Sequence, residues 1–130
     1  MLMDECTLDL DAIGQTMLHC LYSCHGNGYV RERHLRALAN SPHPELAMPF
    51  MVQSFGNWVR EVQLVAFAGL MKQPEAFIAF VQANPQAWQA AKSRATSYWD
   101  CYYQGEDGYP WRQSQTRARI QALAQLLKSG

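Results

Sequence analysis

Apolar side chains recur along this chain at the three- to four-residue spacing of amphipathic helices, and no segment alternates between apolar and polar positions like a β-strand. Residues 8–22 predict a first helix whose inward stripe comprises Leu8, Leu10, Ile13, Met17, Leu18, Leu21 and Tyr22. Gly26-Asn27-Gly28 ends that helix. Residues 29–40 predict a second helix, with Val30, His34 or Leu35, and Leu38 facing inward.

Prolines mark the starts of the next helices, because proline is tolerated in the first turn of a helix and disrupts its interior. Ser41 and Pro42 form such a start, and Pro49 predicts a kink or a restart in a bent helix over residues 44–55. After a turn at Gly56-Asn57, residues 58–71 predict a strong helix that buries Val59, Val62, Ala66 and Leu70.

Three further helices complete the pattern. They cover residues 74–83, 85 to about 103, and 111–128, with a turn at 105–110 before the last one. The chain is therefore expected to be a single all-α domain over residues 1–130, with about seven helices and antiparallel packing of neighbours.

The overall charge argues against nucleic acid as the first partner to consider. The chain has 11 basic and 11 acidic residues, whereas strong nucleic-acid binders concentrate Lys and Arg. Acidic residues gather before residue 30 and basic residues after residue 111. We interpret this as charges that stabilise the ends of helices through the helix dipole, in preference to two oppositely charged ends that orient a partner. No signal peptide or membrane span is evident, so a cytoplasmic location and no membrane partner are expected.

Two cysteines and two histidines lie close together in the sequence between residues 19 and 25. Cys20 and Cys24 would share a helix face, with His19 and His25 beside them, so a metal site can be imagined. Structural metal sites usually take two spaced ligand pairs, and free Cys is often buried. Core thiols are therefore the favoured interpretation, and no metal or cofactor is predicted.

One stretch of the chain nearly repeats itself 29 residues later. Residues 28–38 align with residues 57–67, so that Val30-Arg31-Glu32 matches Val59-Arg60-Glu61 and Tyr29 matches Trp58. Fixed-period repetition is typical of stacked helical solenoids, in which each unit covers the apolar face of its neighbour.

Residues 44–52, Asn57-Trp58-Val59-Arg60-Glu61-Val62, Ala66 and Leu70 resemble the short bacterial form of HEAT-type helical repeats, mainly over residues 28–71. That resemblance implies a short right-handed α-α superhelix with a concave, ligand-facing side and no catalytic residues. It also implies a degenerate third unit over residues 74–103.

The repeated charges admit two interpretations. Arg31, Glu32, Arg60 and Glu61 form either a solvated or salt-bridged ladder, which is favoured, or a row that contacts a partner.

Aromatic residues and arginine gather near the predicted last turn. This cluster comprises Tyr98, Trp99, Asp100, Tyr102, Tyr103, Tyr109, Trp111 and Arg112. Tyr, Trp and Arg anchor protein interfaces, although the same residues could close one end of the helical stack. These rings cannot all share one narrow stripe, so at least one is expected to be exposed.

No common catalytic motif is present, and a non-catalytic module that binds one cognate protein is the leading hypothesis. By fold-level analogy, its most concrete form is an immunity-type inhibitor that masks a bacterial toxin or effector. One alternative is a small enzyme or ligand-binding protein that uses residues 98–112, with Asp100 and Glu106-Asp107 as carboxylates. Another is a nucleic-acid-binding repeat that uses Arg31, Arg33, Arg36 and Arg60.

Overall fold

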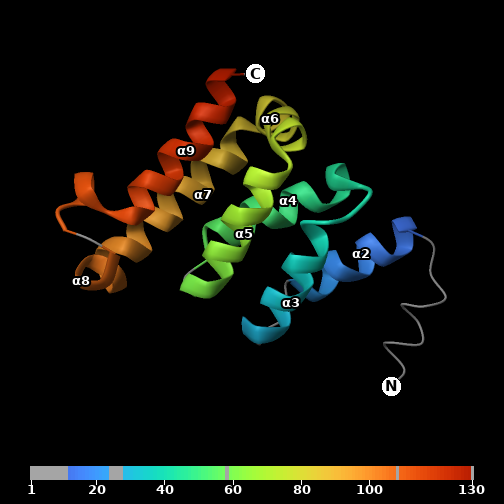
Figure 1. The fold of residues 1–130 in the computed structure, drawn as a ribbon, viewed down its shortest axis with the longest axis horizontal. Coiled ribbons are helices and arrows are strands. Elements are labelled where there is room, and N and C mark those ends of the chain that lie inside the picture. Colours follow the sequence, from blue (N-terminus) through green and yellow to red (C-terminus); the bar gives the residue numbers. More distant parts are fainter. Residues whose placement is uncertain (1–11, 24–27, 58, 108, 130) are drawn as a thin grey trace.

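The computed structural model describes residues 12–23, 28–57, 59–107 and 109–129, and every regular element in those ranges is helical (Figure 1). Seven α-helices there have ten residues or more: α2 (Ala12–Ser23), α3 (Gly28–Leu38), α4 (Pro44–Phe55), α5 (Arg60–Lys72), α6 (Pro74–Ala83), α7 (Pro85–Tyr98) and α9 (Gln115–Ser129). Between α7 and α9 lie the π-helical turn η1 (Trp99–Tyr103), α8 (Gln104–Asp107) and the 3₁₀ turn η2 (Trp111–Gln113). The predicted all-α class and the predicted number of helices are confirmed for this part of the chain. Residues 8–11 of the first predicted helix and the turn at residues 26–27 lie outside the described residues.

Prolines act at helix starts as the sequence predicts for α6 and α7, whereas Pro42, the expected start signal, lies in the loop before α4. Pro44, Pro74 and Pro85 occupy the first turns of α4, α6 and α7. Pro49 lies inside α4 without restarting it. Proline there removes only the hydrogen bond to the carbonyl of Glu45, and both residues are exposed to solvent.

Ser41 has a different role from the predicted helix cap. The N-terminal cap of α4 is His43, and the hydroxyl oxygen of Ser41 accepts the backbone N–H of His43 at 3.0 Å. Ser41 is also hydrogen-bonded to the hydroxyl of Thr16 at 2.6 Å. The serine therefore ties the loop before α4 to α2.

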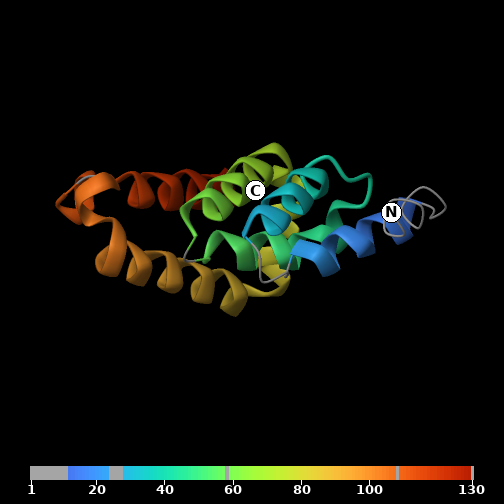
Figure 2. The same cartoon turned by 90° about the horizontal axis from the view of Figure 1, so that it is seen from below.

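The long helices form two layers, which Figure 2 shows edge-on: α2, α4 and α7 lie in one layer, and α3, α5 and α9 lie in the other. Contacts join α2 to α3, α4 to α5, α3 to α5 and α4 to α7. The predicted third unit over residues 74–103 differs from this arrangement. Its helices α6 and α7 touch, but α7 continues the layer of α2 and α4, and α9 takes the place beside α5.

The core is most aromatic where α4, α6 and α7 meet. Trp88 packs against Phe55 with ring centroids 5.9 Å apart and against Phe77 edge-on at 5.3 Å. Gly56 permits close approach here, since a Cβ at this position would lie 3.1 Å from the backbone of Ala91 in α7. The stripe predicted for α5 is confirmed at Val62, Ala66 and Leu70, which are fully buried, while Val59 is half-buried just before the helix.

Two residues predicted on the inward face of α2, Ile13 and Met17, are 48% and 60% exposed. Leu18 is half-buried, and the side chains of Leu21 and Tyr22 lie outside the described residues. Thr16 and Cys20, on another side of the helix, are buried. The helix is therefore rotated so that polar and thiol side chains face its neighbours. The apolar spacing alone could not reveal this, because it shows which residues share a face and not which face is covered.

The last predicted helix also begins later than expected. Residues 111–113 form η2, and Ser114 then accepts the backbone N–H of Arg117 at 3.1 Å, so that α9 starts at Gln115. The predicted inner side of this helix is confirmed, with Leu123 fully buried and Ile120, Leu126 and Leu127 packed against the core. No single helix in the described residues is long and apolar enough to cross a bilayer. Only α5 and α6 taken together reach that length and composition, and they meet at 101°.

Candidate functional site

The π-helical turn η1 places one tryptophan at the centre of the aromatic cluster. Trp99 is only 5% exposed, and Trp111 meets it edge-on with ring centroids 4.9 Å apart. Tyr109 lies nearly parallel to Trp99, at 7° and 6.5 Å between centroids. Residues from η1, η2 and the loop between them are therefore fixed on a single buried indole ring.

Two tyrosines of this segment face solvent. Tyr102 is 66% exposed and Tyr109 is 70% exposed, so the prediction that at least one ring faces solvent is confirmed. Tyr102 stacks on Tyr98 and meets Tyr103 edge-on, with centroids 6.4 Å apart in each pair. A π-helical turn accommodates an extra residue per turn, which changes which side chains share the inner face after Tyr98.

One arginine of the repeated Arg-Glu pairs joins the cluster. The Arg60 guanidinium lies 5.5 Å from the centre of the Tyr103 ring, which is the geometry of a cation–π contact. Glu61, beside it, is exposed. The structure thus brings together the start of α5 and the end of η1, which are far apart in the sequence.

The equivalent pair on α3 is arranged differently. Glu32 forms an ion pair with Arg36, one turn later on the same helix, at 2.6 Å. Arg31 is half-buried, and its Nε atom has no hydrogen-bond partner among the described residues. The two Arg-Glu pairs therefore have different neighbours, despite their matching positions in the repeat.

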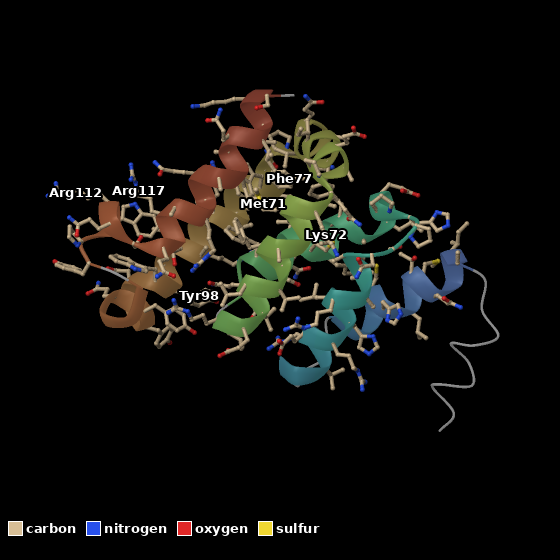
Figure 3. The ribbon with its side chains drawn as sticks, in the orientation of Figure 1. Met71, Lys72, Phe77, Tyr98, Arg112 and Arg117 are labelled. Atoms are coloured by element: carbon tan, nitrogen blue, oxygen red, sulfur yellow. The ribbon has the colours of Figure 1, made fainter. Side chains whose placement is uncertain are left out.

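The charged groups beside the aromatic rings are open to solvent. Asp100 is exposed, and its carboxylate accepts a hydrogen bond from the Gln104 side chain at 2.8 Å. Arg112 is also exposed, and its backbone carbonyl accepts the Arg117 guanidinium at 3.2 Å, which gathers two cations beside η2 (Figure 3). The side chains of Glu106 and Asp107, the other carboxylates considered from sequence, lie outside the described residues.

A histidine pair that sequence reasoning did not find joins α2 to α3. The Nδ1 atoms of His19 and His34 are 2.7 Å apart, with His34 buried and His19 half-buried. Burial lowers the pKa of His19 below 6.5, and the nearby positive charge of Arg33 lowers it further. The residues are 15 positions apart on different helices, so no local spacing pattern indicates this contact.

Of the two neighbouring cysteines interpreted as core thiols, Cys20 is the one that the structure describes, while Cys101 elsewhere in the chain is exposed. Cys20 is buried, and its thiol lies 3.5 Å from the carbonyl oxygen of Leu46. Cys24 and His25 lie outside the described residues. Within the described ranges, no group of three or more His, Cys, Asp or Glu side chains could hold a metal ion.

The structure thus places the residues of the aromatic cluster in two sets of ring contacts, with Asp100 and Arg112 exposed. One set is Tyr109 and Trp111 on Trp99, and the other is Tyr98, Tyr102, Tyr103 and Arg60. We call Tyr102, Tyr109 and Arg112 the aromatic surface. Comparison of the chain with protein-family models, with curated proteins and with solved structures finds no match.

Proposed function

We propose that this protein is a non-catalytic module that binds one cognate protein through the aromatic surface. In its most concrete form it is an immunity-type inhibitor that binds and masks a bacterial toxin or effector, acting in the cytoplasm. The observation that carries the proposal is the pair of solvent-facing tyrosines, Tyr109 stacked on the buried Trp99 and Tyr102 stacked on Tyr98.

The energetics of protein interfaces support this use of the surface. Tyr, Trp and Arg dominate binding hot spots, because each buries a large area and keeps a polar group for hydrogen bonding. Side chains already held in place lose less conformational entropy on binding. Tyr109 is stacked on a buried ring, and Tyr102 is stacked on Tyr98, so both tyrosines begin partly ordered.

A HEAT-like superhelix is the arrangement that we propose for the helices. The division into an α2, α4 and α7 layer and an α3, α5 and α9 layer supports it, as does the contact between successive helices within each layer. The inserted helix α6 is the main departure from a regular stack of hairpins.

Affinity capture from a lysate of the source cell, with the tagged full chain, tests the proposal. One stoichiometric protein should be retained by the wild type and lost with the double variant Tyr102→Ala and Tyr109→Ala. The matched control changes Gln89 and Gln121, which are exposed on α7 and α9, to alanine and should retain the partner. Circular dichroism should show equal helix content in all three proteins.

The alternatives define the results that would overturn the proposal. Retention of a small molecule in place of a protein would favour a ligand-binding protein or enzyme that uses residues 98–112. Retention of nucleic acid, with binding that weakens steeply as salt rises, would favour the nucleic-acid alternative. Equal retention by the double variant would place the partner on another surface. For the immunity form, co-expression should protect cells from the toxin that is captured, and the double variant should not.

A further inference from the structure

A groove with a volume of about 390 Å³ lies between α3 and α5, away from the aromatic surface. It is lined by Arg36, Ala39, Asn40, Val65, Ala68, Gly69 and Lys72. Figure 3 places Met71 and Lys72, at the end of α5, far from Tyr98, Arg112 and Arg117. The groove is therefore a second surface, and a ligand could bind there whether or not the aromatic surface has its proposed role.

Small residues form the floor of the groove because two helices approach closely there. A Cβ on Gly69 would lie 3.2 Å from the Cβ of Ala39, just after α3, and would overlap the end of the Met51 side chain. Ala68, next to Gly69, is exposed and adds no bulk above the floor. The hollow therefore lies above a closely packed contact, with the small side chain of Ala68 at its surface.

An exposed apolar stripe of α5 lies beside the groove. Leu64 and Met71 are exposed large apolar residues outside the groove lining, and Val65, which lines the groove, is half-buried. With Ala68 they follow the helical spacing of one face, while Val62, Ala66 and Leu70 fill the core from the other face. An exposed apolar stripe on a helix is typical of an interaction site.

The rim of the groove is positively charged. Lys72 donates a hydrogen bond to the neutral side-chain oxygen of Asn40 at 2.7 Å, and no carboxylate is among the residues that line the groove. Arg36, the other cation, is paired at 2.6 Å with Glu32, one turn away on α3. Lys72 thus offers a positive charge at the end of the apolar stripe to an incoming anion.

We propose that this groove docks an amphipathic helix of a protein partner, with its apolar side chains on the α5 stripe and a flanking carboxylate at Lys72. A hollow between two helices, with an exposed apolar stripe beside it, suits the helix-in-groove mode of recognition. The charge of the rim selects acidic over basic helices, since rim charges mainly determine partner choice and association rate.

Two synthetic 18-residue peptides serve as the probe. Both carry the same leucine and alanine stripe at helical spacing, one with glutamate along each flank and the other with lysine at the same positions. Titration into the ¹⁵N-labelled full chain should shift the amide signals of Asn40, Ala68, Gly69 and Lys72 with the acidic peptide. The basic peptide should shift them far less, and added salt should reduce the difference.

Two variants and a matched control locate the contact. Lys72→Glu should weaken the acidic peptide about fivefold, as expected for replacing attraction by repulsion at an exposed pair. Ala68→Trp, which fills the hollow from an exposed position, should abolish binding of both peptides. Lys128→Glu, an exposed cation of α9, makes the same charge change elsewhere and should leave the affinity unchanged.

Several outcomes would overturn the docking proposal. These are equal binding of the two peptides, signal shifts confined to residues 98–112, or the same shifts with sodium glutamate alone, which would indicate a site for small anions. Concentration-dependent shifts of the groove residues without peptide would instead assign the groove to a second copy of the chain. None of these results bears on the capture experiment with Tyr102 and Tyr109, so the two proposals can fail separately.

Discussion

Two interfaces between helices in this molecule are built from different chemistry. Where α2 meets α3 and the loop before α4, polar groups do much of the joining: His19 contacts His34 at 2.7 Å, and Thr16 contacts Ser41 at 2.6 Å. Where α4, α6 and α7 meet, Phe55, Phe77 and Trp88 form a continuous aromatic contact.

The difference matters because the two kinds of contact respond to different changes. Burial of aromatic area is non-directional and independent of pH, so it is lost mainly when volume is removed. A hydrogen bond between imidazoles depends on which nitrogen carries a proton, so it changes with pH while the packing stays the same. The first interface should therefore be sensitive to protonation, and the second to truncation.

The largest expected effect on stability comes from Trp88→Ala, which removes the aromatic interface. Trp88 is almost fully buried against Phe55 and Phe77, and its removal should lower the free energy of unfolding by about 3–5 kcal/mol. Urea denaturation followed by circular dichroism measures this change. Gln89→Ala, at the exposed neighbouring position, should change stability by less than about 0.5 kcal/mol. A loss below about 1 kcal/mol for Trp88→Ala would mean that this interface does not dominate the core.

The positions of the helices in the described chain could be predicted from the sequence, because the residues that start and end a helix lie within or next to it. The first-turn prolines Pro74 and Pro85 predict the starts of α6 and α7 within a residue, whereas the start signal expected at Pro42 lies before α4. The stripe on α5 predicts its buried side because that interface is apolar. On α2 the same reasoning failed, since Thr16 and Cys20 face the neighbouring helices and Ile13 and Met17 do not.

The candidate site was predictable in composition and not in arrangement. The high density of Tyr, Trp and Arg indicated residues 98–112. The structure places their rings in two separate sets of contacts, one around Trp99 and one around Tyr102. The π-helical turn η1 determines which ring is buried, and no residue pattern in this segment predicts such a turn. The contact of Arg60 with Tyr103 depends on how α5 lies relative to η1, so it could be known only from the fold.

An intermediate effect on stability is expected at the histidine pair when the pH is lowered. The pKa of His19 in the folded chain lies below its ordinary value of 6.5, because of burial and then Arg33. The unfolded chain therefore binds a proton more readily, so stability contributed here is complete above about pH 6.5 and falls as pH drops toward the folded-state pKa.

Urea unfolding midpoints between pH 7.5 and 5 measure this dependence. The wild type should lose stability across that range, and His19→Asn should lose less because it removes the group that titrates. Trp88→Ala should keep the pH dependence of the wild type despite its lower stability, since it leaves the histidine pair intact. An identical pH profile in His19→Asn would assign the acid sensitivity to other groups and remove this distinction between the interfaces.

The smallest effect on stability is expected at Met17, which the sequence predicted to lie on the inward face of its helix. If Met17 belonged to the core, Met17→Gln would bury an amide and cost several kcal/mol. Because Met17 is 60% exposed on α2, the substitution should instead change the free energy of unfolding by less than about 0.5 kcal/mol. The matched change Met51→Gln, at a fully buried position of α4, should cost at least about 2 kcal/mol. A large loss for Met17→Gln in the same urea assay would show that the side of α2 carrying Ile13 and Met17 is covered in solution. The α2 interface would then resemble the aromatic one more closely than its polar contacts indicate.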